Sequence, residues 1–499
     1  MKIRDFTSAI LQQSGLALAI VYDLNFEGNI YYKNKNIRDW AEATVEYWAA
    51  IQLSDGSFNE YYPWEHGFPP TAFSLYSACE IYKRLGMDSS NLKDKFRKTA
   101  KYLSTHIEEK AFNQEIASIT ALYNAYTVLN EQWILEGLNR KLDRVLTLQS
   151  EEGWFPEYGG ADIGYLSVAF DMLAEYYWIS KDERVKKPLE KTLNFIKYFI
   201  HPDSTAGGEY GSRNTTYFLP NGLEVLSCNG NKIAEGAIQI LFGNADKNNF
   251  FLDSTDDRYF SHYLLHSFTR ALEKRMQTKA CTEAEALPFE FVHEKVFSEA
   301  GLISFSNGVY SAFISMKKGG VIKIFNEGKE VFIDCGYRIE YGKGCAAATN
   351  WIDDSYKVLY SENEYSVEGN MNKISLKVST PILHVGLRAI ALVFGNKIIS
   401  FLKKKIIFVD KHNDVQFKRD IKLTNNNIII TDNFYSSNEV NILSASNMSL
   451  RHVASGKFFM TSDLISNSRR KYNGIGTLKL LTNVHVDKCS TEVSYDRLE

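Results

Sequence analysis

The sequence has few of the residues that cross-link loops or bind metal ions. Its 499 residues include six cysteines, nine prolines and ten histidines. No two cysteines form a CxxC pair, so we expect reduced thiols rather than disulfides or a cysteine-based metal site. HxH, HExxH and Walker-type glycine-rich patterns are missing as well, and we expect neither a metal ion nor another cofactor.

The sequence also lacks an excess of charge and any long apolar run. Lysine and arginine number 57 and aspartate and glutamate 60, so a net charge of −3 leaves no overall basic field to attract nucleic acid or an anionic membrane. No run approaches about 18 apolar residues, and Asp5, Gln12 and Gln13 interrupt the stretch that an export signal needs. We therefore expect no nucleic-acid or membrane partner and a cytoplasmic location, while the oligomeric state is left open.

Aromatic residues, in contrast, are abundant. The chain has 29 tyrosines, 31 phenylalanines and 7 tryptophans, together 13% of its residues. Tyr and Trp side chains offer flat faces with a hydrogen-bonding tip. Such faces suit sugar rings as well as ordinary protein cores.

The first part of the chain has the periodicity of helices. Apolar residues recur at helical spacing, as in Trp40, Ala43, Tyr47 and Trp48. This spacing predicts helices over residues 39–48, 71–85, 92–107, 115–129, 135–148, 166–179, 185–200 and 260–276. Loops with Gly, Pro and aromatic residues separate them.

The pattern changes near residue 290. Short β-branched runs divided by Asn, Gly and Asp turns predict strands at 301–305, 309–316, 321–325, 331–334, 374–378, 397–408, 415–421 and 428–431. Residues 280–296, which include Pro288, form the expected linker. We therefore expect a multidomain α+β protein, with a helical domain at 1–285 and an antiparallel β-sandwich at 286–499.

A loose internal repeat joins pairs of helices. One copy spans residues 51–60, with Gly56 and Glu60, and the other spans 148–157, with Gly153 and Glu157. Each copy ends a helix in an acid–Gly turn, where glycine suits a left-handed conformation, and then places an aromatic residue and a Glu before the next helix. Repeated helix–loop–helix units with elaborate loops on one side predict an incomplete (α/α) toroid whose loops line a cleft.

Two of these loops resemble segments of a known enzyme family. The run EGWFPE at 152–157, followed by Tyr165 at a helix start, resembles a segment of the polysaccharide lyases related to heparinase II/III and alginate lyase. Asn113, at the start of another helix, is similar to the family's Asn that neutralises a uronate carboxylate, and Gln114 stands where many members have His. The resemblance implies a toroid followed by antiparallel sheets, and a carbon–oxygen lyase that acts on an acidic polysaccharide or oligosaccharide.

β-Elimination on a uronic acid requires hydrogen-bond donors and a proton carrier. Asn113, Gln114 and Arg213 can donate to the carboxylate and stabilise the charge that develops there. Tyr165 can take the proton next to the carboxylate or supply one to the leaving oxygen, beside a cation such as Arg213. Three histidines are candidates to share this proton transfer: His66, His384 and His452. The expected sugar-binding residues are Trp64, His66, Glu157, Asn214 and Tyr217.

These residues also allow other interpretations. Asn113 just before a helix can be an N-cap, Arg213 can clamp its own loop, and Tyr217 can belong to the core. Six loop carboxylates make a glycoside hydrolase an alternative: Asp55, Glu60, Glu152, Glu157, Asp162 and Glu209. A carbohydrate-binding protein of glycan assembly, without a catalytic centre, is the third possibility.

Overall fold

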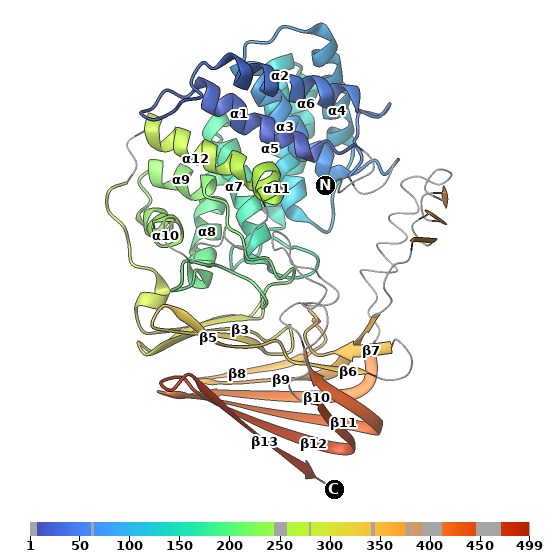
Figure 1. Ribbon diagram of the computed structural model, residues 1–499, viewed down its shortest axis with the longest axis vertical. Coiled ribbons are helices and arrows are strands. Elements are labelled where there is room, and N and C mark those ends of the chain that lie inside the picture. Colours follow the sequence, from blue (N-terminus) through green and yellow to red (C-terminus); the bar gives the residue numbers. More distant parts are fainter. Residues whose placement is uncertain are drawn as a thin grey trace.

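The protein consists of a helical domain followed by two antiparallel sheets (Figure 1). The computed structural model describes residues 7–60, 64–243, 257–278, 281–340, 345–375, 412–445 and 471–498, with 381–382, 385–386 and 389–390. The predicted fold class, a toroid of helices and a β domain, is confirmed. No helix within these ranges combines the length and the apolar character that crossing a membrane demands.

The helices form two layers. The inner layer consists of α1 (Ser14–Asp23), α3 (Phe68–Arg84), α5 (Phe112–Leu129), α7 (Ile163–Ser180), α9 (Asn221–Cys228) and α12 (Leu265–Gln277). Each inner helix contacts the next, and α12 returns to α1. The outer layer of the described residues consists of α2 (Lys35–Ala50), α4 (Ser90–Thr105), α6 (Gln132–Thr147), α8 (Lys186–Ile196) and α10 (Lys232–Phe242), and α11 (Asp257–Tyr259) is a short turn before α12.

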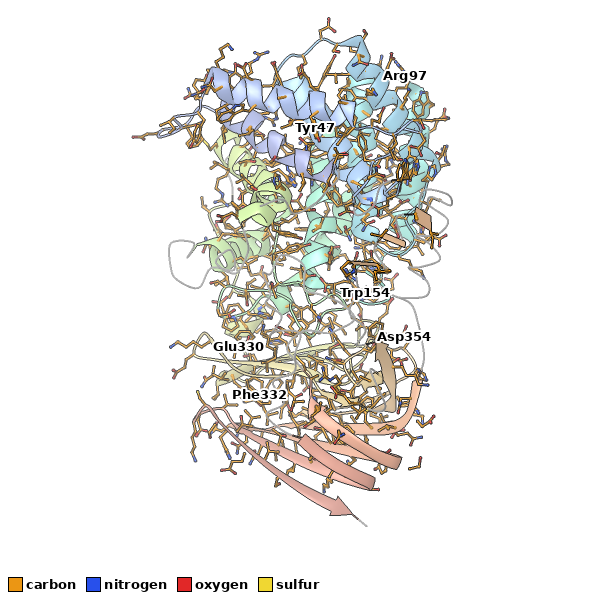
Figure 2. All side chains as sticks on the ribbon, turned by 45° about the vertical axis from the view of Figure 1, so that its right-hand side comes forward. Tyr47, Arg97, Trp154, Glu330, Phe332 and Asp354 are labelled. Atoms are coloured by element: carbon orange, nitrogen blue, oxygen red, sulfur yellow. The ribbon has the colours of Figure 1, made fainter. Side chains whose placement is uncertain are left out.

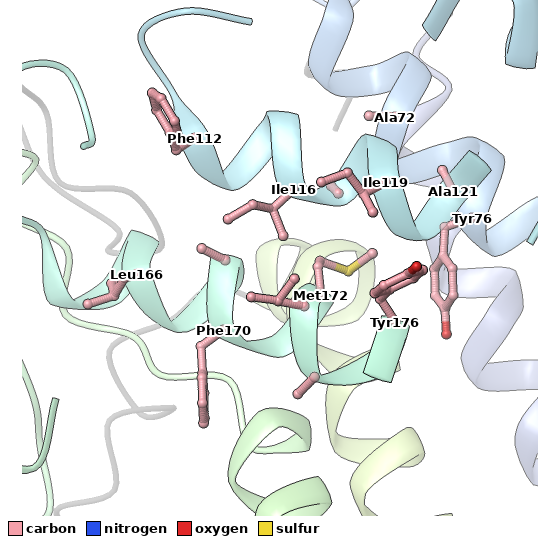
Figure 3. Close-up of a cluster of buried hydrophobic side chains, with 14 of the residues drawn as sticks. Ala72, Tyr76, Phe112, Ile116, Ile119, Ala121, Leu166, Phe170, Met172 and Tyr176 are labelled. Carbon is pink, nitrogen blue, oxygen red and sulfur yellow. The ribbon is translucent and has the colours of Figure 1, made fainter. Parts of the chain in front are cut away.

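The two layers follow from the residues on each helix. α5 and α7 are apolar around most of their circumference and are buried on nearly all sides, whereas α4, α6 and α8 turn a charged face outward. Ile116 and Ile119 of α5 lie against Met172 of α7 in the shared core (Figure 3). The eight predicted helices correspond to α2 through α8 and to α12, whereas α1, α9 and α10 were not predicted individually.

The sequence repeat is also a repeat of contacts. In each copy the Gln side chain donates to a Thr hydroxyl of the following outer helix: Gln52 to Thr99 at 2.7 Å, and Gln149 to Thr192 at 3.0 Å. Gly56 and Gly153 have φ values of +91° and +107°. A Cβ at either glycine would lie 2.3 Å from a backbone carbonyl oxygen of that same helix. Both turns are therefore docked on an outer helix in the same way.

The β region forms two sheets. The smaller contains β1 (His293–Phe297), β2 (Leu302–Ser306), β3 (Tyr310–Ser315), β4 (Val321–Asn326) and β5 (Lys329–Asp334) in chain order. The larger contains β6 (Tyr337–Glu340), β7 (Cys345–Ala348), β8 (Lys357–Ser361), β9 (Glu364–Ser375), β10 (His412–Leu423), β11 (Asn427–Ser444), β12 (Lys471–His485) and β13 (Ser490–Leu498). Its order is β10-β9-β7-β6-β11-β12-β13, with β8 on β9, and β10 also pairs with β11, so the sheet curls.

The smaller sheet lies between the helices and the larger sheet (Figure 1). Phe313 and Phe325 belong to the apolar cluster of the toroid, while Ile314 and Ile322 of the same two strands belong to the cluster shared with the larger sheet. β2, β3 and β4 are buried on both faces for this reason, apart from the half-buried end of β4. The smaller sheet thus faces the loop end of the toroid.

The structure differs from the sequence prediction at the expected linker. β1 begins at His293, inside the predicted linker of 280–296, and pairs with β2 through His293 and Ser306. Charged residues dominate this edge strand and hide its periodicity. β9 ends at Ser375, and the remainder of the predicted strand at 374–378, the strand at 397–408, His384 and His452 lie outside the described residues.

Gly153→Ala should destabilise the helical domain strongly. The substitution strains a left-handed backbone and drives a methyl group into the Lys191 carbonyl, for which we expect a loss of about 2–5 kcal/mol in the free energy of unfolding. Gly86→Ala is the matched control, because φ is +61° there and no atom lies within 4 Å of the new methyl group. Urea unfolding followed by far-ultraviolet circular dichroism compares the two, and equal losses would contradict the docking of this turn.

Candidate functional site

The loops before α5 and α7 pair with each other at the end of the toroid that faces the sheets. Trp154, from the second repeat loop, lies at this end of the helical domain (Figure 2). Ala111 and Glu157 form an isolated antiparallel bridge, and the Tyr158 N–H donates to the Lys110 carbonyl at 2.8 Å. This pairing places Asn113 beside Glu157, and Asn113 Nδ2 donates to Glu157 Oε2 at 2.6 Å.

Asn113 does not cap its helix. α5 begins at Phe112 with Ala111 as its N-cap, so Asn113 lies within the first turn, and its side chain reaches Glu157. The N-cap interpretation of the sequence is therefore wrong by two positions. The neighbouring Gln114 is half-buried, and its buried Oε1 has no hydrogen-bond partner within the described ranges.

Asp162 joins the start of α7 to the loop that carries Arg213. Its Oδ1 accepts from the Tyr165 N–H at 3.0 Å and so caps α7. Its Oδ2 accepts from the Arg213 N–H at 2.7 Å and from the Thr215 N–H at 3.4 Å. One buried carboxylate thereby holds the backbone of Tyr165 and that of Arg213 in a fixed relation.

The guanidinium of Arg213 lies among phenol rings. Its central carbon is 4.4 Å from the ring centroid of Tyr158 and 5.7 Å from that of Tyr165, and both Arg213 and Tyr165 are only partly buried. Burial opposes the charge of Arg213, but the neighbouring Tyr165, Tyr158 and Glu157 outweigh it and raise the pKa of the guanidinium. Arg213 is therefore a permanent cation beside Tyr165.

Glu157 interacts electrostatically with this cation. Its side chain is buried, and burial raises the pKa of the carboxyl to about 8 against the opposing effects of the Asn113 hydrogen bond and the Arg213 charge. Its second oxygen, Oε1, has no hydrogen-bond partner in the described part of the chain. The sequence suggested Glu157 for sugar binding, whereas its side chain is buried in the structure.

Asn214 contacts the β domain. It has a φ of +57° and is buried, and its Oδ1 accepts from Lys318 Nζ. Lys318 comes from the turn between β3 and β4 and also donates to the carbonyls of Glu209 at 2.7 Å and Gly211 at 2.6 Å. Lys318, in the β3–β4 turn of the smaller sheet, thus anchors the Arg213 loop through three hydrogen bonds.

The remaining predicted residues lie around this cluster or in the first repeat loop. The Tyr217 ring is buried and lies edge-on to that of Tyr165, with centroids 6.1 Å apart. Trp64 is 43% exposed and has a φ of +60°. His66, with a φ of +53°, places Nδ1 2.6 Å from Asp55 Oδ2. Asn113, Glu157, Tyr165, Arg213 and Tyr217 are therefore brought together, while Trp64 and His66 are placed on a separate loop.

Three residues of the site were missed or undervalued in the sequence. Tyr158 follows the recognised EGWFPE run directly, and Asp162 lies three residues before Tyr165, where an N-cap aspartate is expected. Lys318 precedes two glycines in a hairpin turn, and no sequence pattern connects it to a loop more than 100 residues earlier.

Comparison with known proteins identifies the fold. No protein-family model matches the sequence, and no curated protein matches it either. Among solved structures, chondroitin AC lyase from Streptomyces coelicolor A3, in complex with chondroitin sulphate, aligns with a TM-score of 0.56 and 9% identity over 97% of this chain and 71% of that one. Xanthan lyase from Paenibacillus aligns with a TM-score of 0.53 and 8% identity over 98% of this chain and 51% of that one.

The chain therefore has the fold of these polysaccharide lyases. It spans about half the length of the xanthan lyase, 51%, and 71% of the chondroitin lyase. At this level of identity the likeness concerns the fold, and the chemistry has to be argued from the residues of the site.

Asp162→Ala should cost more stability than the loss of an ordinary helix cap. It removes the acceptor of three backbone N–H groups, one of them in a buried hydrogen bond and two in part-buried ones, for which we expect about 2–4 kcal/mol. Asn231→Ala is the control, because Asn231 caps α10 through one N–H and its loss should cost about 1 kcal/mol. Chemical unfolding of both variants measures the difference, and equal costs would show that the Arg213 loop does not depend on Asp162.

Lys318→Met should change the pH dependence of stability. Burial lowers the pKa of Lys318 to about 8, below the 10.5 of an unburied lysine, so the unfolded chain binds more protons between these values. The free energy of unfolding of the wild type should therefore rise with pH across this window, relative to the variant, by up to about 3 kcal/mol. Urea unfolding at the two ends of the window measures it, with Lys317→Met, an exposed ion pair with Asp354, as the control. A wild-type-to-variant difference that stays constant with pH would count against a buried Lys318.

Proposed function

We propose that this protein cleaves a uronic-acid-containing polysaccharide or oligosaccharide by β-elimination. The observation that carries the proposal is the cluster in which Arg213 lies against Tyr165 while Asn113 lies against Glu157, at the loop end of a polysaccharide-lyase fold. The chondroitin AC lyase and the xanthan lyase described above are both lyases, and the first is described in complex with chondroitin sulphate, an acidic polysaccharide. The narrower likeness to heparinase II/III and alginate lyases stays a prediction.

Each residue of the cluster has a separate role in the proposed reaction. Arg213 and the amide of Asn113 bind the carboxylate of the substrate and stabilise the enolate that forms when the adjacent proton leaves. Asn113 is buried and donates one N–H of its amide to Glu157, and we assign the second N–H of the same amide to the substrate. Tyr165 carries the proton, because negative charge on its oxygen is stabilised by the nearby guanidinium.

The structural contacts of the loop carboxylates favour the lyase over a glycoside hydrolase. Glu152 accepts from the backbone N–H groups of Glu299 and Ala300, both at 2.8 Å. Asp162 holds three backbone N–H groups, and Glu209 pairs with Lys323 at 3.2 Å. Carboxylates with such contacts are less suited to act as the free acid and base that glycoside hydrolysis requires.

Tyr165→Phe should abolish product formation while leaving the fold intact. The test incubates wild type and variant with chondroitin sulphate, xanthan and alginate, and follows the ultraviolet absorbance of the unsaturated sugar. We expect a loss in kcat of about 100-fold or more, because the proton carrier is gone. Tyr176→Phe is the control, since Tyr176 lies on the same helix and its hydroxyl donates to Asp182 at 2.7 Å, away from the cluster.

The other outcomes separate the alternatives. New reducing ends without ultraviolet absorbance would replace the lyase with a hydrolase. Binding of the polymers with neither signal would replace it with a carbohydrate-binding protein. Full activity in Tyr165→Phe would remove Tyr165 from the mechanism.

A further inference from the structure

Glu157 is a buried carboxyl with few of the contacts that stabilise a buried negative charge. It accepts from the side chain of Asn113 at 2.6 Å, the backbone N–H of Asn113 also favours its ionised form, and Oε1 has no hydrogen-bond partner within the described residues. Other buried carboxylates of this protein have more hydrogen-bond donors or cations around them. Asp162 accepts three backbone N–H groups, and Glu175 contacts Lys274 at 2.7 Å and Arg270 at 3.3 Å.

Among the described residues, the charged groups with the largest effect on Glu157 are at the α7 N-cap and in the Arg213 loop. Arg213 favours the ionised carboxylate, whereas the buried Asp162 disfavours it. Tyr158 also interacts electrostatically with Glu157. Burial is the largest effect and sets the pKa at about 8, so the carboxyl is mostly protonated at neutral pH.

A neutral Glu157 changes what Arg213 and Asn113 can do. An ionised Glu157 would partly offset the positive charge of Arg213, and the attraction of the site for an anion would fall. A neutral carboxylic acid leaves the positive charge uncompensated by Glu157. It still accepts from Asn113 through Oε2, so the orientation of the amide is retained.

We propose that Glu157 is a positioning residue that adds no negative charge to this site: as a neutral acid it orients the amide of Asn113 and does not offset the charge of Arg213, which attracts the carboxylate of the substrate. The substrate class in this inference rests on the proposed function, whereas the protonation state of Glu157 rests on its burial and its contacts. Deprotonation of Glu157 should therefore lower the affinity of the site for the anionic sugar. No bond to carbon is made or broken at Glu157.

The kinetic test compares Glu157→Gln with the wild type across pH. The amide is neutral at every pH and keeps an oxygen that accepts from Asn113. KM of the wild type should rise about fivefold between pH 8 and pH 9, because only the neutral form binds well, whereas KM of Glu157→Gln should stay flat. Glu151→Gln is the control, since it removes an exposed charge six residues away and should keep the rise of the wild type.

The outcome for Glu157→Ala separates orientation from charge. This variant is neutral but no longer holds Asn113, so we expect a flat KM together with a loss in kcat that Glu157→Gln does not show. A large loss of kcat in Glu157→Gln at pH 7 would overturn the inference, because it would make the carboxyl itself a proton donor or base. A wild-type rise in KM that persists in Glu157→Gln would also overturn it.

A second measurement needs no substrate. Infrared spectra of the wild type at pH 7 should contain the carbonyl stretch of a protonated carboxyl that is absent in Glu157→Gln and disappears from the wild type as the pH rises through about 8. Absence of this band overturns the inference even if the enzyme is a lyase. Presence of the band together with no turnover of any uronate polymer would instead overturn the proposed function and leave the neutral Glu157 in place.

Discussion

The arrangement of the site depends on one buried carboxylate. Asp162 caps α7 with one oxygen and binds the backbone of the Arg213 loop with the other, across about 50 residues of chain. Because an amide side chain has only one acceptor oxygen, the carboxylate is the group that can serve both segments at once. Tyr165 and Arg213 are neighbours in space for this reason, and their contact is the basis of the proposed proton transfer.

The β region provides a second set of contacts that hold the loops of the site. Lys318, from the smaller sheet, donates to two carbonyls and to Asn214 in the Arg213 loop. The Glu152 carboxylate accepts hydrogen bonds from two backbone N–H groups in the segment before β2. The smaller sheet is apolar on both faces, so it is fixed between the toroid and the larger sheet. The loops of the helical domain are thereby held from two sides, and a site on them is more precisely ordered than one on free loops.

The elements that could be predicted from sequence are those governed by local chemistry. Helical periodicity identified α2 through α8, and the Gly56 and Gly153 turns follow from a left-handed backbone that glycine adopts without strain. The partner of Asn113 could not be predicted in this way. Its contact with Glu157 depends on a bridge between Ala111 and Glu157 that joins two loops 46 residues apart, whereas the local sequence offered only the carboxylate of a substrate or an N-cap role.

The sequence by itself determined the fold class, the left-handed glycine turns and the set of polar residues near the loop end, because periodicity, backbone conformation and hydrogen-bonding capacity belong to individual residues and short segments. Only the tertiary structure decided which of these residues meet and what charge they carry. The side chain of Glu157 is chemically the same as that of any other glutamate, but burial beside Asn113 and Arg213 sets its pKa near 8. Desolvation depends on everything that surrounds a group, and those surroundings come from segments distant in the chain.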